Sequence, residues 1–261
     1  MRFSRKQLGI PYAVFLICFV IAPLLVVLYY AFTNGQGQFT VQNFVNFFTS
    51  ENTIGTLAYS LVTAVTVTAC CTLVAYPVAY ILARSDIKKK NVLLVLFIAP
   101  MWINFTLRVV ALKEVLTMVE GNLAYHPFLN TVLGMTYDFL PFMILPLYTT
   151  LEKLDKSYLE AAADLGASPV ITFIKVTLPL SMPGLISGVT MVFLPSMTNY
   201  VILDMLYNST YIMGSLIGSY FHAYDWNSGS MISIVLLAII FLVTWATNGF
   251  SEEETTRGAF L

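Results

Sequence analysis

The chain has 261 residues, of which 58% are hydrophobic and only 10% are charged. A soluble domain of this length carries roughly 25% charged residues. The apolar runs reach about 20 residues, the length at which a helix crosses a hydrocarbon core of ~30 Å. The formal net charge of −1 argues neither for a nucleic-acid partner nor for a polybasic membrane surface. The composition therefore predicts an all-α integral protein of a lipid membrane, without a nucleic-acid partner.

Six apolar segments are long enough to cross a membrane, and helices rather than a barrel fit their length. The first follows Arg2, Arg5 and Lys6, as in a signal peptide, but it is too long and has no clear small-x-small cleavage site. We therefore expect an uncleaved span there. The fourth contains Pro141 and Pro146, which membrane helices tolerate. We expect a single transmembrane domain over residues 1–261, with spans at about 8–32, 56–83, 91–117, 131–151, 182–205 and 229–248.

The Lys and Arg residues lie in alternate connections between these segments. The first, third and fifth connections contain none, and only Arg108 and Lys113 lie within a span, toward the outer end of the third. Cytoplasmic connections are the ones enriched in Lys and Arg. The pattern therefore predicts that both termini and the connections at 84–90 and 152–181 face the cytoplasm. The positive residues on that side are Arg2, Arg5, Lys6, Arg84, Lys88, Lys89, Lys90, Lys153, Lys156, Lys175 and Arg257.

The first outer connection, over residues 33–55, has two glycines near its start and then polar–apolar alternation over 38–41. Glycines mark turns, and alternation of this kind is typical of a segment with one apolar face. We expect a short amphipathic element on the outer surface.

The sequence indicates no chemistry of its own. Cys18, Cys70 and Cys71 all lie in apolar segments, where small buried residues are common, and adjacent cysteines on one helix cannot readily bridge. His126 and His222 lack metal-ligand spacing. We expect no disulfide, metal site, cofactor or catalytic residue.

The cytoplasmic connection at 152–181 has the local signals of two short helices. Ser157 and Glu160 have the spacing of a capping box, and Gly166 suits the left-handed position after a helix. Ser168 is a cap for a second helix that starts at Pro169. Pro179, ten residues on, is expected to end or bend that helix. From the residues alone, such a pair either covers the end of the bundle or enters a groove of a partner.

The order Glu160-Ala161-Ala162, then Gly166, then Leu178-Pro179 resembles the EAA loop of ABC importer permeases. In that family the loop supplies a coupling helix, between spans four and five, that docks in a cleft of a separate ATP-binding subunit. The resemblance implies that Glu160, Ala161, Ala162 and Gly166 are docking residues. It also implies an inner-membrane location and, as partners, a dimer of ATP-binding subunits, a second homologous permease and an extracytoplasmic substrate-binding protein. This sequence has no Gly-x4-Gly-Lys-Ser/Thr run to bind ATP itself.

Wider stretches resemble the spermidine/putrescine permeases of this family, among them Ala75-Tyr-Pro-Val-Ala-Tyr80 and Leu178-Pro-Leu-Ser-Met-Pro-Gly184. The resemblance implies polyamine import. The same mechanism with another organic cation, an amino acid or a metal complex stays open. A secondary transporter or channel would need an inverted repeat or a filter, and neither is visible.

Two acidic residues in or at the ends of spans are candidates for a cation pathway. An ionised group within a span usually faces a cavity or a partner, which favours Asp138 and Asp204. Tyr200 lies near Asp204 in the sequence and can hold a cation over its ring. The alternative is that Arg108 or Lys113 pairs with these carboxylates or with Glu114.

Trp102, Asn104 and Arg108 in the third segment are further pathway candidates. Asn104 shares a helix face with Arg108 by i, i+4 spacing, and Trp102 lies off that face. The alternative is an interfacial Trp anchor and an Arg whose charged end reaches toward the headgroups.

Gly184 and Gly188 form a small-x3-small face at the start of the fifth segment, and Pro195 interrupts its middle. Such a face lets two helices approach closely. We expect close helix packing at this point.

Overall fold

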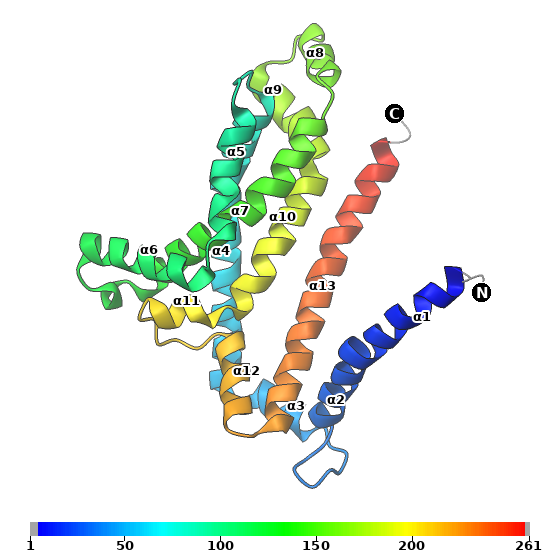
Figure 1. The fold of residues 1–261 in the computed structure, drawn as a ribbon, viewed down its shortest axis with the longest axis vertical. Coiled ribbons are helices and arrows are strands. Elements are labelled where there is room, and N and C mark those ends of the chain that lie inside the picture. Colours follow the sequence, from blue (N-terminus) through cyan, green and yellow to red (C-terminus); the bar gives the residue numbers. More distant parts are fainter. Residues whose placement is uncertain (1–4, 259–261) are drawn as a thin grey trace. The chain divides into compact units, whose positions relative to one another are not determined.

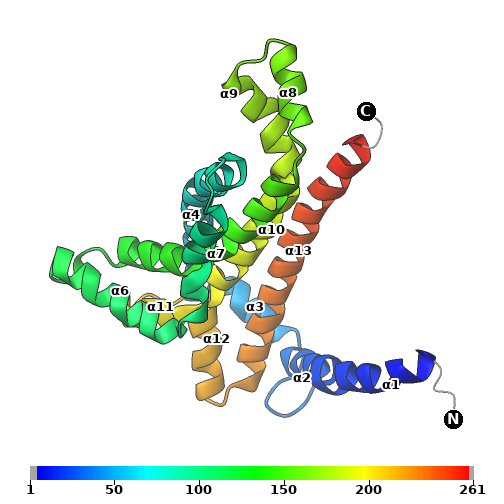
Figure 2. The same cartoon turned by 45° about the horizontal axis from the view of Figure 1, so that its top comes forward.

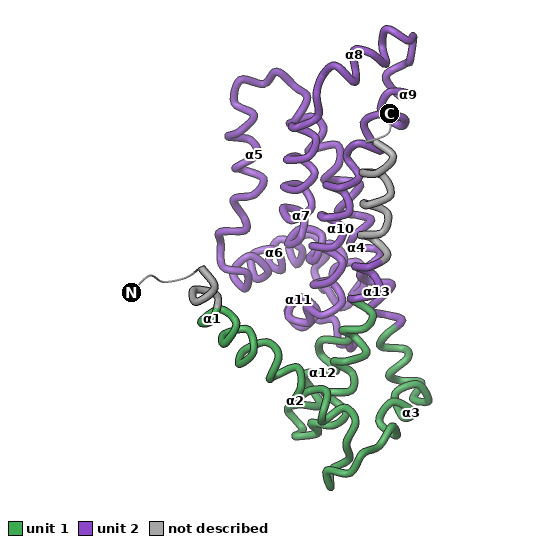
Figure 3. Tube along the Cα trace, turned by 90° about the vertical axis from the view of Figure 1, so that its right-hand side faces the viewer, with its two compact units in different colours: residues 1–57, 213–240 green, residues 58–212, 241–261 purple. Residues whose placement is uncertain are grey.

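The computed structural model describes residues 5–258, and the side chains of residues 10–245. Arg2 of the N-terminal basic group lies outside the described residues. The chain is helical along nearly all of the described range (Figure 1). It divides into two compact units, unit 1 with residues 1–57 and 213–240 and unit 2 with residues 58–212 and 241–261 (Figure 3). Two of the dividing points fall within helices α4 and α13, and the third lies directly before α12.

Unit 1 is organised around the carbonyl end of α2. The side-chain amide of Asn43 donates to the carbonyls of Ala31 and Thr33 at 3.0 and 2.9 Å, and Asn227 donates to those of Tyr30 and Thr33. These bonds satisfy carbonyls that have no partner within a helix. The elements are α1 (Arg5–Leu16), a π-helical turn (Ile17–Ile21), α2 (Ala22–Ala31), α3 (Gln42–Thr49), the start of α4 (Glu51–Arg84), α12 (Met213–His222) and the first part of α13 (Trp226–Gly258).

Helix α3 is the amphipathic element expected in the first outer connection. Phe47 is buried on one face, whereas Val45 and Phe48 on the other face are exposed. The short amphipathic element is present as a two-turn helix, and its place on the outer surface stays a prediction.

Unit 2 has a core in which α4 and α10 contact α7. Small residues of α4, among them Cys71, Ala75 and Ala79, are fully buried together with Met143 and Leu147 of α7. Its elements are the rest of α4, α5 (Lys90–Ile98), a 3-10 turn (Ala99–Trp102), α6 (Phe105–Glu120), a 3-10 turn (Leu123–Tyr125), α7 (Pro127–Lys153), α8 (Ser157–Asp164), α9 (Pro169–Thr172), a π-helical turn (Phe173–Thr177), α10 (Leu178–Thr198) and α11 (Tyr200–Met205).

The expected small-residue face lies where α10 packs against α7. A Cβ atom built on Gly184 would lie 2.8 Å from the carbonyl oxygen of Pro146, and one on Gly188 would lie 2.5 Å from the sulfur of Met143. A methyl group at either position would require a neighbouring atom to shift. The two glycines therefore allow close packing of these helices, as predicted.

Five helical stretches of the described residues are long and apolar enough to span a membrane: Ile10–Ala31, Glu51–Arg84, Pro127–Lys153, Pro169–Thr198 and Trp226–Trp245. The third expected span, 91–117, is not one straight helix. It comprises Lys90–Trp102 and Phe105–Glu120, which are bent by 101° relative to each other.

Local chemistry explains this bend. Pro100 lacks a donor, Ile103 and Asn104 have extended ψ angles of 143° and 129°, and the Asn104 side chain accepts from the Leu107 amide at 3.4 Å. The segment thus contains a helix terminator and a helix cap. Because the segment is apolar throughout, hydropathy alone predicted a continuous helix and did not indicate the terminator or the cap.

The fifth expected span, 182–205, also differs. Helices α9 and α10 form one stretch, Pro169–Thr198, so the second loop helix does not end at Pro179. The π-helical turn Phe173–Thr177 precedes Pro179, and the Leu178 amide bonds back to the Phe173 carbonyl. The helix then breaks at Asn199, and α11 follows as a separate short helix.

Candidate functional site

The first helix of the candidate coupling loop is capped differently from the expected capping box. Helix α8 begins at Ser157, and the carboxylate of Asp155 accepts a hydrogen bond from the Ser157 amide at 3.0 Å. This backbone hydrogen bond lowers the pKa of Asp155 below its usual value. Asp155 rather than Ser157 therefore bonds the first free amide of α8, whereas Lys156 at the N-cap position makes no side-chain cap bond.

The end of α8 is the glycine-terminated motif that the sequence predicts. Gly166 has φ +77°, its amide bonds to the Ala163 carbonyl at 2.9 Å, and the Ala167 amide bonds to the Ala162 carbonyl at 3.0 Å. This pair of bonds defines a Schellman motif. The Ser168 hydroxyl then accepts from the Ile171 amide at 3.4 Å and caps α9 as expected.

The base of the loop is tied to neighbouring helices of unit 2. Arg84 at the end of α4 donates to the Leu154 carbonyl at 3.1 Å. Lys90 of α5 lies 3.3 Å from the Glu152 carboxylate, which also accepts from the Tyr148 hydroxyl at 2.7 Å. These contacts fix the position at which the chain leaves α7.

Aromatic packing fixes the other end of the loop. The ring of Phe173 packs edge-on against Tyr76 and Tyr80 of α4, with centroid distances of 5.5 and 5.6 Å. The Tyr76 hydroxyl also shares a 2.6 Å hydrogen bond with Ser181 of α10. The π-helical turn is therefore held against α4.

Between these anchors, the tip of the loop is apolar and exposed. In Figure 2, α8 and α9 extend beyond the adjacent ends of α7 and α10. Leu165 is 89% exposed, and Tyr158, Val170 and Ile174 are also exposed. Glu160, Ala161 and Gly166 are exposed and Ala162 is half-buried. An exposed apolar surface with a charged rim is suited to a protein partner.

Asp138 lies in a buried ion pair rather than at an open surface. Its carboxylate is 2.6 Å from the guanidinium of Arg108, and the two side chains are only 2% and 6% exposed. The pair joins α7 to α6. Of the alternatives left open by the sequence, pairing with Arg108 is the one that the structure shows.

The other pathway candidates are not gathered with Asp138. Asp204 and Tyr200 are exposed on α11. Asn104 caps α6, and Trp102 is exposed in the 3-10 turn. Within the described range, no group of three or more His, Cys, Asp or Glu has the arrangement of a metal site.

Lys113 does not pair with Asp204. Its ammonium lies 3.0 Å from the Tyr207 hydroxyl and 4.2 Å from the centroid of that ring. Tyr207 itself adopts a positive φ of 57°. This contact joins α6 to the segment after α11.

Asn208 is a structural residue that sequence reasoning missed. Its amide donates to the Tyr59 hydroxyl at 2.9 Å and the Thr131 hydroxyl at 2.8 Å, and its own oxygen accepts from the Thr210 amide. It begins the triplet Asn-Ser-Thr, which matches a glycosylation acceptor. Because Asn208 is buried within a hydrogen-bond network, the triplet serves packing between α4 and α7.

Residues 75–251 match the family described as the binding-protein-dependent transport system inner membrane component. This match covers more than half of the chain, so the chain belongs to that family. It is thus a multi-pass inner-membrane protein, the non-catalytic permease subunit of an ABC importer.

Two relatives are more specific. The chain is 34% identical over 275 residues to the spermidine/putrescine transport system permease protein PotB of Haemophilus influenzae, covering 95% of this chain and 94% of the relative. It is 35% identical over 217 residues to the protein of the same name from Escherichia coli, covering 76% of this chain and 79% of the relative.

Solved structures share the fold. One is a chain of a bacterial alginate ABC transporter in complex with an alginate pentasaccharide-bound periplasmic protein. Its TM-score to this chain is 0.71 at 14% sequence identity, and the alignment covers 95% of this chain and 93% of that one. Another is a chain of the MetNI methionine ABC transporter, with a TM-score of 0.59, 17% identity, and coverage of 78% and 99%.

Proposed function

We propose that the chain imports polyamines, spermidine and putrescine, with energy from ATP hydrolysed by separate subunits. The observation that carries the mechanism is the α8–α9 loop, which has fixed ends and an exposed apolar tip. In the proposal, Glu160, Ala161, Ala162 and Gly166 dock on an ATP-binding subunit. Because α9 continues into α10 as one helical stretch, movement of the loop is passed directly to a membrane-spanning helix.

The proposed orientation places both termini and the α8–α9 loop in the cytoplasm. The concentration of Lys and Arg in the connections at 84–90 and 152–181 supports it. The ATP-binding subunits, as a dimer, meet the complex on this side. A second homologous permease completes the pathway, and an extracytoplasmic binding protein delivers the cargo from the opposite side.

The polyamine assignment is supported by the two relatives named above, both described as spermidine/putrescine permeases. Asp204 and Tyr200 suit such a cargo, because an exposed carboxylate and an aromatic ring each attract an ammonium group, the ring by ~0.5 to 2 kcal/mol. Asp138 is a weaker candidate, since Arg108 neutralises it. Trp102 and Asn104 are further candidates: Trp102 is exposed, whereas Asn104 already caps α6.

Uptake into proteoliposomes that contain the complete complex tests the cargo. We expect accumulation of radiolabelled spermidine or putrescine, and severalfold less when Asp204→Asn removes the carboxylate. Glu114→Gln is the matched control, because Glu114 is an exposed acid of α6. Normal polyamine uptake by the Asp204 variant would remove that residue from the pathway. Uptake of an amino acid or a metal complex in place of polyamines would contradict the polyamine assignment but not the ATP-driven mechanism.

A further inference from the structure

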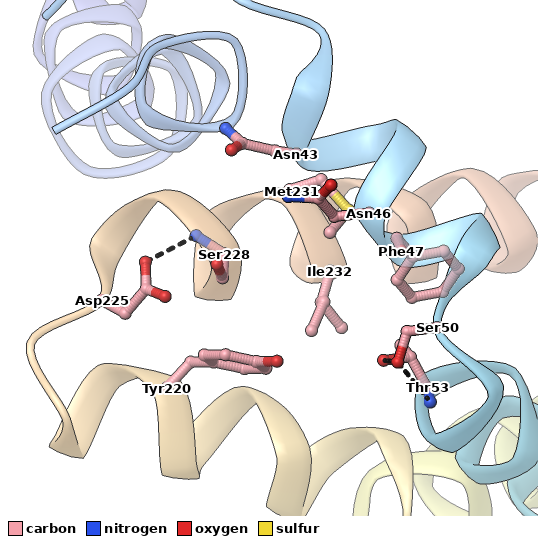
Figure 4. A pocket seen from close by; sticks show the side chains of 10 residues that line it. All are labelled: Asn43, Asn46, Phe47, Ser50, Thr53, Tyr220, Asp225, Ser228, Met231 and Ile232. Atoms are coloured by element: carbon pink, nitrogen blue, oxygen red, sulfur yellow. Dashed lines mark hydrogen bonds between the residues drawn. The ribbon is translucent and has the colours of Figure 1, made fainter.

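Unit 1 contains a polar cavity that the proposed function does not use. It has a volume of about 270 Å³ and lies among α3, α12 and the starts of α4 and α13 (Figure 4). Phe47, Met231 and Ile232 form its apolar part and are all buried. The remaining lining residues are polar: Asn43, Asn46, Ser50, Thr53, Tyr220, Asp225 and Ser228.

The cavity carries negative but no positive charge. Asp225 is the only charged residue among the described residues of the lining, which include no Lys, Arg or His. One oxygen of its carboxylate accepts from the Ser228 amide at 3.0 Å and thereby caps α13. The second oxygen has no partner among the described residues. Asn43 donates its amide protons to the carbonyls of Ala31 and Thr33, and its oxygen accepts no hydrogen bond from another described residue.

The arrangement separates a charged end from a hydroxyl end. Figure 4 shows Asp225 and Tyr220 at one end of the cavity, with the Tyr220 ring extending toward Ser50, and Phe47 and Thr53 at the other end. At the far end, the Thr53 hydroxyl already donates to Ser50 at 3.0 Å. A ligand that brings positive charge and several donors to the Asp225 end would match the available groups.

We propose that this cavity binds one terminal primary ammonium group of a linear alkylamine. The ammonium donates to the free oxygen of Asp225 and lies against the ring of Tyr220, which attracts a cation. The methylene chain packs on Phe47, Met231 and Ile232. The volume is near the lower end of the range of about 300–1,000 Å³ for small-molecule sites, so the cavity takes a small amine or one end of a longer one. The inference gives the permease an amine site of its own, and it rests on the proposed function only for the identity of the natural amine.

Binding of radiolabelled putrescine to the purified membrane complex in nanodiscs, without the binding protein, tests the site. Asp225→Asn is expected to weaken binding at least about tenfold, because the ammonium loses a charged acceptor. The same change keeps the helix cap, since Asn and Asp cap equally well. Glu51→Gln is the control, because Glu51 is an exposed acid of unit 1 outside the lining, and binding is expected to stay within about twofold.

A second variant tests the cavity without altering its charge. Asn46 is exposed and lines the cavity, so Asn46→Trp fills the space and is also expected to weaken binding. For the wild type, n-butylamine is expected to compete with putrescine and neutral 1,4-butanediol is not. The proposal is overturned if the wild type binds no putrescine, if Asp225→Asn binds normally, or if the diol competes equally. ATP-driven uptake by the same preparation is measured separately, so loss of this site and loss of the proposed transport are distinguishable.

Discussion

The ion pair between Arg108 and Asp138 shows how one residue can determine the role of another. A carboxylate within a membrane segment is costly unless it is matched, and Arg108 matches it at 2.6 Å. The Nε and Nη1 atoms of Arg108 are buried without a hydrogen-bond partner among the described residues. The pair is thus neutral as a whole but incompletely bonded, so its stability depends on both partners being present.

We expect Arg108→Gln and Asp138→Asn each to destabilise the permease by about 3–5 kcal/mol, because each leaves one buried charge uncompensated. The double variant should recover most of this loss, since it leaves a neutral pair. The thermal midpoints of the four purified proteins form a double-mutant cycle. Additive losses would mean that the two charges do not interact in the membrane.

Gly166 supports a prediction about backbone conformation alone. A Cβ at this position would meet no atom within 4 Å, so any cost of substitution comes from its φ of +77°. Gly166→Asn should retain transport, because Asn adopts left-handed conformations readily, whereas Gly166→Val should lose it. Retention of the ATP-binding subunit during purification, measured with uptake, checks this. Equal activity of the two variants would refute a role for the loop's shape.

At the scale of elements, contact between α7 and α10 depends on two glycines that are not equivalent. A methyl group on Gly184 would meet the Pro146 backbone, whereas one on Gly188 would chiefly meet the flexible end of Met143. We expect Gly184→Ala to cost about 1–3 kcal/mol through overpacking and Gly188→Ala to cost less. The yield of folded protein and its thermal midpoint, measured for both variants, show which substitution costs more. The reverse order would contradict the packing described here.

The π-helical turn before α10 supports a prediction about coupling. Phe173 holds this turn against Tyr76 and Tyr80, and each edge-on aromatic pair contributes about 0.5–1.5 kcal/mol. Phe173→Leu keeps an apolar side chain but loses both pairs. We expect less cargo transported for each ATP hydrolysed, with the ATP-binding subunits still bound. An unchanged ratio of cargo transported to ATP hydrolysed would show that the Phe173 contacts do not contribute to coupling.

Much of this local structure was predictable from short sequence signals. The end of α8 and the start of α9 follow from Gly166, Ser168 and Pro169, because caps and left-handed positions depend on neighbours in the sequence. The bend near Asn104 was missed although its signals are local, since the surrounding residues are as apolar as a continuous span. The helix break at Asn199 was missed for the same reason.

Contacts between elements were harder to predict from the sequence. No local rule selects Arg108 over Lys113 as the partner of Asp138, because the choice depends on how α6 lies after its bend. Likewise, Asp225 is a plain helix cap in the sequence, and only packing of α3 and α12 encloses it in a cavity. Long-range packing therefore decided which polar residues are paired and which remain available.

At the scale of the whole molecule, the chain is a membrane permease that takes its energy from a partner. Its family membership and the exposed α8–α9 loop both support this account. The most direct test is uptake of radiolabelled spermidine by proteoliposomes that contain the complete complex and binding protein, loaded with either ATP or a non-hydrolysable analogue. The account predicts accumulation with ATP alone. Equal accumulation with the analogue would contradict it.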